Sequence, residues 1–497
     1  MQLQGASKEI RKESRKERAM PPSDEQILHW NPWWRDPAAI TYDPKLRALA
    51  KRRLRWDPPV LDAMELGPQR VHTLRGPRQV GKSTTAKRMI QGLLERGERR
   101  ILYFSFDLST RHADLVEVVQ RARQLHPDPE GSWYVFLDEV TTVPDWQLGV
   151  KYIIDSGLGE EDFVLCTGSS ARKVGSEQLP GRRGAGRHYL QLPVSFRDFC
   201  TGALGIELPE ETITPGQILT PEGLRLLRRI NLEWSHLERA WRIYQEVGGF
   251  PAAIEDYLRE GEVTEDTVEM LWDIMAGDVQ ELGRSEVAVL KLLERVGRSL
   301  GAPLAWESLA EDMDVSQPTA RAYVEVLAQS FILLMVFAWD MSGKGLSARK
   351  QRKVYFADPL LGRVAPQRVP GSRRPHPAAL RENLIGVGLY RSATDRLVQA
   401  DPMVGSLCFW KSGRGREIDF VIAEATQHGH GHRLPVEVKG DASRNVGNAR
   451  KSISRAFGRG IIVTESLLDL EHEIPAVPAP VFLAALRERP ERRSTSL

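Results

Sequence analysis

The sequence predicts an α/β protein with a parallel-sheet core in its N-terminal half and a second α/β domain near its C-terminus. Two observations predict the core: a strand pattern that turns through glycines into a helix pattern at residues 71–95, and an apolar run at 133–137 that ends in two carboxylates. A third observation predicts the C-terminal domain, because strand patterns at 416–422 and 434–439 carry acidic residues. Alternating apolar residues indicate strands, and helical spacing of apolar residues indicates helices.

Length and composition set the broad class. At 497 residues, the chain is too long for one ordinary hydrophobic core and is expected to form several domains. Its net charge of +3 is too small to indicate a nucleic-acid partner by itself. Three cysteines without metal-ligand spacing argue against a disulfide framework or a zinc cluster. No apolar run reaches the about 18 residues of a transmembrane helix, and no signal pattern is present, so we expect a cytoplasmic protein without a membrane partner.

The N-terminal arm has two parts with different chemistry. Charges of both signs are mixed at 8–18, which is typical of a solvated segment without chemistry of its own. Trp30, Trp33 and Trp34 follow, and we expect these rings to pack on the core as a strap. A partner-binding surface is the alternative for the three tryptophans.

The first strand turns into the first helix of the core through a phosphate-binding loop pattern. The pattern G-x-x-x-x-G-K-[ST], with one further hydroxyl, occupies Gly76, Pro77, Arg78, Gln79, Val80, Gly81, Lys82, Ser83 and Thr84. In such a loop, backbone N–H groups surround phosphates, the lysine contacts the β and γ oxygens, and the serine hydroxyl ligates Mg²⁺. A structural glycine turn is the alternative. Because a strand precedes the loop and a helix follows it, we expect ATP or GTP binding.

The second apolar strand ends in Asp138 and Glu139. We expect Asp138 to hold the Mg²⁺ shell and Glu139 to orient or deprotonate the attacking water, because phosphoryl transfer depends on positioning and charge neutralisation. Lys82 and Glu139 are therefore the candidate catalytic residues. A buried strand that ends in a solvated acidic turn is the alternative.

Two later segments carry candidate accessory residues for the same site. The strand pattern at 162–168 ends in small hydroxyl residues, and Thr167 and Ser169 are candidates for a polar sensor of the γ-phosphate. An ordinary strand-to-loop turn would favour the same residues. The glycine-rich basic loop that follows carries Arg182, a candidate arginine finger for a neighbouring subunit's nucleotide. That role implies a homo-oligomer, and a solvated surface arginine is the alternative.

Helical patterns dominate the middle of the chain. Residues 222–260 are amphipathic and are interrupted by Gly248 and Gly249, as expected for a helical lid. Residues 304–337 predict a helix, a tight turn, a second helix and a hydrophobic hairpin, which together indicate a winged helix-turn-helix. Gln317 and Arg321 would face the major groove if this segment reads DNA. A packing or regulatory role is the alternative.

Two other segments carry potential ligands. Lysines and arginines outnumber acids at 349–374, where an exposed basic loop at 363–374 is expected to contact a phosphate backbone or to be merely solvated. His428, His430 and His432 alternate in a connection between strands. Such histidines can ligate a transition metal, but a solvated turn is the simpler interpretation.

The C-terminal strand patterns carry a second candidate site. Asp419 lies on one strand, and Glu437 and Lys439 share one face of the next. The two carboxylates can share Mg²⁺ while the lysine positions or activates water, and Glu382 on the preceding helix can complete the metal shell. This is the arrangement of the PD-(D/E)xK nuclease-like fold. Copies of such a fold that keep a polar core without activity are the alternative.

Six motifs follow one another in a fixed order along the chain. They are Gly76–Ser83, Phe136–Glu139, Thr167–Ser170, Leu179–Arg182, Pro193–Phe199 and Gly248–Pro251. Together they resemble a widespread group of prokaryotic AAA-type P-loop ATPases that carry a C-terminal domain of unknown function with a restriction-endonuclease-like fold. Arg416–Ile422 and Val436–Lys439 resemble the same group, so the resemblance covers about residues 45–487. The long connection that contains His428 departs from the group's pattern and leaves the geometry of the second metal site open.

The resemblance implies five parts and an ATP-dependent function. The parts are an N-terminal arm at 1–43, an AAA-type ATPase core at 44–205, a helical lid at 206–300, a winged-helix segment at 301–345 and a nuclease-like domain at 346–490. We expect an ATPase that uses ATP and Mg²⁺ and that acts on DNA or is regulated by it. The alternative is an ATP-driven regulatory switch whose C-terminal domain is an inactive platform for a protein partner.

Overall fold

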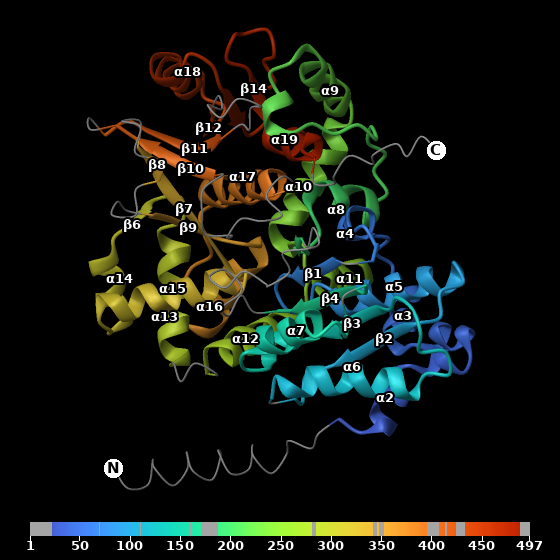
Figure 1. Ribbon diagram of the computed structural model, residues 1–497. Helices are drawn as coiled ribbons and strands as arrows, with labels where there is room; N and C mark the ends of the chain where they lie inside the picture. The colour runs from blue at the N-terminus through green and yellow to red at the C-terminus, as the bar shows by residue number, and fades with distance from the viewer. Residues whose placement is uncertain are drawn as a thin grey trace, which may run out of the picture. The chain divides into compact units, whose positions relative to one another are not determined.

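The computed structural model divides the chain into two compact units (Figure 1). Unit 1 contains residues 1–52 and 60–191, and unit 2 contains residues 53–59 and 192–497. No helix in the described part of the chain is long and apolar enough to cross a lipid bilayer. The structure describes residues 22–487 except 69, 110, 160, 170–186, 281–284, 341–344, 347–351, 395–406, 413–414 and 424–432.

Unit 1 is built on a five-stranded parallel sheet with the order β2-β3-β4-β1-β5. The strands are rich in apolar residues and are mostly buried, as is typical of parallel sheets covered on both faces. The bounds are β1 Arg70–Arg75, β2 Ile101–Ser105, β3 Tyr134–Asp138, β4 Phe163–Gly168 and β5 His188–Leu190. The sheet order places β4 between the strand that leads into the glycine loop and the strand that ends in the two carboxylates.

Helices cover both faces of this sheet. α6 (Ala113–Leu125) and α7 (Trp146–Asp155) share one apolar cluster with strand residues such as Leu137, and α5 (Lys82–Glu95) shares another with strand residues such as Phe136. Adjacent strand residues point to opposite faces, so each strand contributes to both clusters. The parallel α/β core predicted from the sequence is confirmed.

The N-terminal strap packs against the open edge of the sheet, as expected. It contains α2 (Asp24–Trp30), the 3₁₀ helix η1 (Pro32–Trp34) and α3 (Pro44–Ala50). β2 is an edge strand, and the side-chain amide of Asn31 accepts from the N–H of Tyr103 at 2.7 Å and donates to its carbonyl at 2.9 Å. The indole N–H groups of Trp33 and Trp34 donate to the carbonyl of Ile101. The strap therefore satisfies backbone groups that an edge strand leaves unpaired.

Unit 2 begins with a helical region. The Gly248-Gly249 interruption expected from the sequence separates two of its helices. The bounds are α8 Phe196–Gly202, α9 Pro221–Asn231, α10 Trp234–Val247, α11 Pro251–Glu260, α12 Glu265–Gln280 and α13 Glu286–Arg298. After these come β6 Pro303–Leu304, α14 Trp306–Met313, α15 Gln317–Gln329, β7 Leu333–Asp340, β8 Gly345–Leu346 and β9 Arg352–Phe356.

Strands β6 to β9 and the strands of the second half of unit 2 form one sheet of nine strands. Its order is β14-β13-β12-β11-β10-β7-β9-β6, with β8 paired to β7. Helix α17 contacts β9, β10, β11 and β12 and so crosses one face of the sheet. The remaining bounds are α16 Val364–Arg368, α17 Pro377–Thr394, β10 Leu407–Lys411, β11 Glu417–Ala423, β12 Arg433–Val438, α18 Ser443–Phe457, β13 Ile461–Thr464, β14 Ala476–Pro478 and α19 Ala479–Ala485.

A buried carboxylate joins distant segments of unit 2. Asp358 accepts from the N–H groups of Gly249 at 2.7 Å and Leu360 at 3.0 Å. Gly249 in turn accepts from the N–H of Val194 at 2.7 Å. Gly248 has a φ of 69°, and an added Cβ there would lie 2.1 Å from Asp358 Oδ1. Two sequence motifs, at 193–199 and 248–251, therefore have a structural role in the packing of unit 2.

Substitution of Asn31 tests how much the strap stabilises unit 1. We expect Asn31→Ala to lower the free energy of unfolding by about 2–5 kcal/mol, because it leaves two buried backbone groups of Tyr103 unsatisfied. Urea denaturation measures the effect. Ser23→Ala, which removes only the cap of α2, is the control and should cost about 1 kcal/mol or less. Equal losses in the two variants would contradict a specific role for Asn31.

Candidate functional site

The glycine-rich loop between β1 and α5 has the backbone shape of a phosphate-binding loop. Gly76, Gln79 and Gly81 have φ values of 150°, 66° and 92°, which turn the chain tightly before α5 begins. A side chain is excluded at Gly76, because an added Cβ would lie 1.9 Å from the carbonyl oxygen of Gln191. The first N–H groups of α5 have no intrahelical acceptor, so they suit an anion.

Gln191 holds this loop from the end of the neighbouring strand. Its side-chain amide donates to the carbonyl of Val80 at 2.7 Å and accepts from the hydroxyl of Thr85 at 2.9 Å. Sequence analysis did not identify Gln191, because its role depends on the pairing of β5 with β1. No local pattern near residue 191 signals that contact.

Lys82 begins α5 and its side chain folds back over the loop. Its Nζ atom donates to the carbonyl oxygens of Gly76 at 3.0 Å and Pro77 at 2.9 Å. The residue is buried, whereas Ser83 and Thr84 in the same helical turn are half-buried. These two carbonyl oxygens are neutral, so each competes weakly with a phosphate for the ammonium group.

The carboxylates of Asp138 and Glu139 lie at the carboxyl end of β3. Asp138 is buried and accepts from the hydroxyl of Tyr103 at 2.6 Å and from the hydroxyl of Thr167. Glu139 has a left-handed backbone with a φ of 53°. Burial raises the pKa of the Glu139 carboxyl, while Lys82 acts in the opposite direction. A raised pKa makes Glu139 a better proton acceptor than an exposed carboxylate.

Thr167 and Ser169 connect the two carboxylates to β4. The hydroxyl of Thr167 accepts from the N–H of Glu139 at 3.1 Å, and the hydroxyl of Ser169 donates to Glu139 Oε2 at 3.3 Å. The structure therefore brings Lys82, Asp138, Glu139, Thr167 and Ser169 together at one end of the sheet. Arg182 lies outside the described residues.

A buried lysine and tyrosine support Asp138 from the side of the strap. Lys87 Nζ lies 3.5 Å from the centre of the Tyr103 ring, 4.7 Å from that of Trp33 and 3.3 Å from Asp43 Oδ2. Tyr103 in turn donates to Asp138. Burial and the charge of Asp138 raise the pKa of the Tyr103 hydroxyl, so it stays protonated as a donor. Sequence analysis missed Lys87 and Tyr103, because neither belongs to a motif.

The residues expected to face a DNA groove have partners within unit 2. Gln317 lies in the first turn of α15, where its amide donates to Glu307 Oε1 at 3.0 Å. The guanidinium of Arg321 lies 5.2 Å from the centre of the Trp306 ring, and the residue is exposed. Arg321 therefore keeps a solvent-facing cation on α15, while Gln317 is half-buried.

The four residues of the C-terminal candidate site converge. Asp419 and Glu437 lie on adjacent antiparallel strands, where the N–H of Asp419 donates to Glu437 Oε2 at 3.1 Å. Lys439 Nζ lies 2.7 Å from Glu437 Oε1 and 3.8 Å from Asp419 Oδ2. Glu382 from α17 joins them through another lysine, Lys353. Burial and the charge of Asp419 raise the pKa of Glu382 and of Glu437 to about 7.

Lys353 is a member of this cluster that sequence analysis did not identify. Its Nζ atom lies 2.7 Å from Glu417 Oε1, 3.0 Å from Glu382 Oε1 and 3.3 Å from Asp419 Oδ1, and its side chain is 0% exposed. Burial acts to lower the pKa of Lys353, but the three carboxylates outweigh it and raise the pKa. Lys353 belongs to the basic stretch at 349–374 but lies before the loop at 363–374 that was expected to be exposed, and it is enclosed.

The rest of that basic stretch is helical at first, and the residues after 368 form the expected loop, in which Arg373 and Arg374 are exposed. Residues 359–368 are helical, and Arg368 and Arg374 form ion pairs with Glu269 and Glu246. The charge pattern alone did not reveal these acidic partners, because they come from distant helices. His428, His430 and His432 lie outside the described residues. Among the residues that the structure describes, no three His, Cys, Asp or Glu side chains form a group suited to hold a metal ion.

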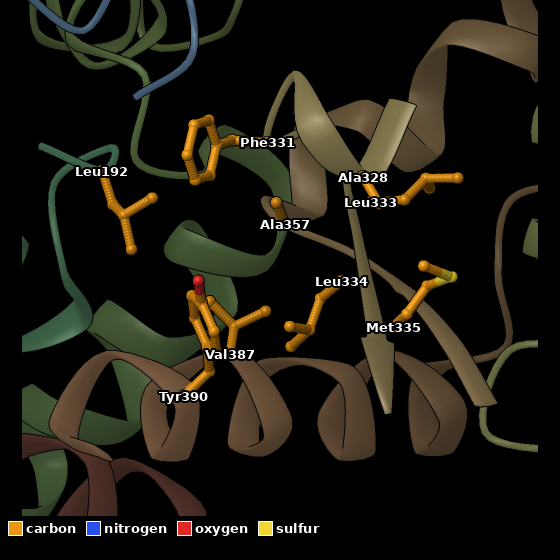
Figure 2. Close-up of a pocket in the computed structure, with 9 residues that line it drawn as sticks. All are labelled: Leu192, Ala328, Phe331, Leu333, Leu334, Met335, Ala357, Val387 and Tyr390. Carbon is orange, nitrogen blue, oxygen red and sulfur yellow. The ribbon is translucent and has the colours of Figure 1, made fainter. Parts of the chain in front are cut away.

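A small hollow in unit 2 is apolar and does not resemble a nucleotide site. It lies beside β7 and α17, and Val387 and the ring of Tyr390 rise into it from α17 (Figure 2). A phosphate needs N–H donors or cations, and no charged side chain belongs to its lining, which consists of Leu192, Ala328, Phe331, Leu333, Leu334, Met335, Ala357, Val387 and Tyr390.

Two family matches divide the chain. Residues 68–200 match the family described as "AAA domain", and residues 238–366 match a "Domain of unknown function (DUF8612)". The first match spans the glycine loop and the carboxylates at the end of β3, so this part of the chain is similar to an AAA domain, in agreement with the prediction. The second match includes Lys353 and ends before Glu382, and its description gives no function.

Similar proteins add little about function. An uncharacterized protein of Methanocaldococcus jannaschii is 27% identical over 293 residues, which cover 57% of this chain and 59% of that protein. The chain thus spans about three fifths of that relative's length. The Orc1 protein of Aeropyrum pernix in complex with DNA is 16% identical, with 70% of this chain and 96% of that chain covered and a TM-score of 0.28. Cdc6p of Pyrobaculum aerophilum is 12% identical, with 70% and 96% covered and a TM-score of 0.23. TM-scores this low support no conclusion about what this chain binds.

The buried cation of Lys87 gives unit 1 a specific pH dependence. Burial outweighs the attraction of Asp43 and lowers the pKa of Lys87 from 10.5 to about 8. Between these values the unfolded chain binds more protons than the folded one. This contribution to stability is therefore complete above pH 10.5 and is lost as the pH falls through 8.

We expect the free energy of unfolding of the wild type to rise between pH 8 and 10 relative to that of Lys87→Met, by up to about 1.4 kcal/mol per pH unit. Urea denaturation of both proteins in matched buffers measures the difference. Parallel pH profiles of the two proteins would show that Lys87 is not titrated in this range.

Proposed function

We propose that this protein binds ATP with Mg²⁺ and hydrolyses it at the glycine loop of unit 1. The observation that carries the proposal is the convergence of Lys82, Asp138 and Glu139 at the end of the parallel sheet where β1 and β3 end on either side of β4. Ligands in open α/β sheets bind at such ends. The match to an AAA domain over residues 68–200 supports the same conclusion.

The residues of the glycine loop and of β3 fit both the phosphates of ATP and Mg²⁺. The left-handed turns at Gly76 and Gly81 direct the loop around the N-terminus of α5, which suits phosphates. Ser83 supplies a hydroxyl and Asp138 a buried carboxylate, which are ligands that Mg²⁺ prefers. When bound, Mg²⁺ neutralises charge on the phosphates and fixes their orientation.

Each side chain of the site has a separate role in phosphoryl transfer. Lys82 moves from the neutral carbonyls of Gly76 and Pro77 to the β and γ oxygens, where a charged partner binds it more strongly. Glu139 orients the attacking water and accepts its proton. Thr167 and Ser169 hold Asp138 and Glu139 in place and sense the γ-phosphate. Arg182 of a neighbouring copy is proposed as an arginine finger.

Two substitutions test this assignment. We expect Lys82→Ala to abolish nucleotide binding, because it removes the phosphate cation. Glu139→Gln should keep ATP binding and lower the turnover number by at least about 100-fold, because the amide cannot accept the proton. Titration calorimetry and a phosphate-release assay measure the two effects.

Asp145→Asn makes the same change of charge at an exposed residue with a positive φ, which asparagine tolerates. This variant should turn over ATP like the wild type. Undiminished ATP binding by Lys82→Ala, or undiminished turnover by Glu139→Gln, would refute the assigned roles.

We further propose that the ATPase acts on DNA or is regulated by it. Support comes from the order α13-β6-α14-α15-β7-β9, in which two helices joined by a tight turn precede paired strands, as in a winged helix. The strands β10 to β13, with Asp419, Glu437 and Lys439, support a nuclease-like fold for residues 346–490. The five-part division at 1–43, 44–205, 206–300, 301–345 and 346–490 remains our proposal.

A second candidate is an ATP-driven switch whose C-terminal domain is an inactive platform for a protein partner. The observation that favours it is that Gln317 and Arg321 already have partners within unit 2. ATP would then control assembly with a protein partner or with further copies of the chain. The two candidates differ in their response to nucleic acid.

ATP turnover with and without duplex DNA separates the two candidates. If the protein acts on DNA, we expect stimulation of turnover, and Arg321→Ala should weaken DNA binding and reduce its salt dependence by about one phosphate contact. Arg225→Ala changes an exposed arginine that pairs with Glu222 on α9, so it is the control and should leave DNA binding unchanged. No stimulation by duplex or single-stranded DNA would favour the switch.

A further inference from the structure

The acidic cluster of unit 2 contains a cation of its own. An ammonium group has three N–H donors, and Lys353 has three carboxylate neighbours, on Glu382, Glu417 and Asp419. Lys353 comes from β9, although β10 and β7 lie between β9 and β11 in the sheet order. The centres of the Tyr355 and Phe420 rings lie 5.6 Å apart, so large side chains of β9 and β11 meet although the two strands are not neighbours.

Several oxygens of the cluster also have other protein donors. Asp419 Oδ2 accepts from the N–H of Val438 at 2.9 Å, and Glu437 Oε2 accepts from the N–H of Asp419. Glu437 Oε1 pairs with Lys439. Glu382 Oε1 accepts from Tyr355 as well as from Lys353. These are the oxygens that a divalent ion would need.

Cations of the protein already neutralise part of the charge of the cluster. Four carboxylates, those of Glu382, Glu417, Asp419 and Glu437, face the ammonium groups of Lys353 and Lys439. Mg²⁺ demands a nearly octahedral set of oxygens at about 2.1 Å, and the enclosed Lys353 ammonium stands among the oxygens that would supply that set. An ion would have to displace a fully buried side chain.

We infer that Lys353 is the resident cation of this cluster and takes the place of a divalent metal. The inference rests on the nuclease-like fold proposed for residues 346–490, and it assigns that fold a metal-independent polar core. It is independent of ATP hydrolysis in unit 1. It follows that removing the ammonium group while keeping the volume of the side chain converts the cluster into a site for a divalent cation.

Mn²⁺ is the probe that tests this inference. Three full-length proteins are compared without nucleotide: the wild type, the single variant Lys353→Met, and the double variant that adds Asp419→Asn. Their thermal unfolding is followed with and without millimolar Mn²⁺. Lys353→Met leaves buried carboxylates without their cation, so its Tm should fall by on the order of 10 °C. Mn²⁺ should restore most of that loss, and the added Asp419→Asn should abolish the recovery. The Tm of the wild type should not change with Mn²⁺.

Lys87→Met is the matched control, because it removes a buried lysine that pairs with the single carboxylate of Asp43. Mn²⁺ should not raise the Tm of this variant. Recovery of Lys87→Met comparable to that of Lys353→Met would overturn the inference, as would a folded Lys353→Met that Mn²⁺ does not stabilise.

A second measurement uses only the wild type and Asp419→Asn, so it tests the inference even if Lys353→Met does not fold. Electron paramagnetic resonance counts Mn²⁺ bound to the wild type and to Asp419→Asn. If both proteins bind the same number of Mn²⁺ ions, the inference is supported. If Asp419→Asn binds one Mn²⁺ ion fewer than the wild type, the inference is overturned. ATP turnover of the wild type and of Lys82→Ala is measured separately and tests the proposed ATPase function. Failure of that proposal can therefore be distinguished from failure of the inference about Lys353.

Discussion

Parallel pairing of β1, β4 and β3 is the constraint on which the phosphate-binding end of unit 1 depends. The register pairs Arg75 with Gly168 and Leu137 with Cys166, so the three strands end at one level. Thr167 on the central strand then reaches Asp138 on one side, while the glycine loop begins on the other. A slip of one residue would turn every side chain of a strand to the opposite face and would separate these groups.

The edge of that sheet is stabilised from outside, and the stabilisation extends to the site. Asn31 pairs with the free backbone groups of Tyr103, and Lys87 lies against the ring of the same residue. The hydroxyl of Tyr103 fixes one oxygen of Asp138, and Thr167 contacts the other. A carboxylate that two donors hold loses little conformational entropy when it binds a cation. The strap therefore contributes to the preorganisation of Asp138.

Local patterns account for most of what the sequence predicted. The strands and helices of unit 1 follow from apolar spacing, and Gly76, Lys82, Asp138 and Glu139 follow from motifs with a known mechanism. Tyr103, Gln191 and Lys353 could not be found in this way, since each acts through a contact with a segment distant in sequence. Lys353 lies in a stretch rich in basic residues, and no local pattern indicates that carboxylates from α17 and β11 enclose it.

A comparison of Lys82 and Lys353 shows how similar side chains reach different chemical states. Both are buried. Lys82 donates to the neutral carbonyls of Gly76 and Pro77, and a phosphate offers its ammonium group a stronger partner than either carbonyl. Lys353 has three carboxylate partners, and a phosphate or a metal would have to break all three contacts inside a low-dielectric core. The first arrangement suits a binding site, and the second suits a permanent part of the fold.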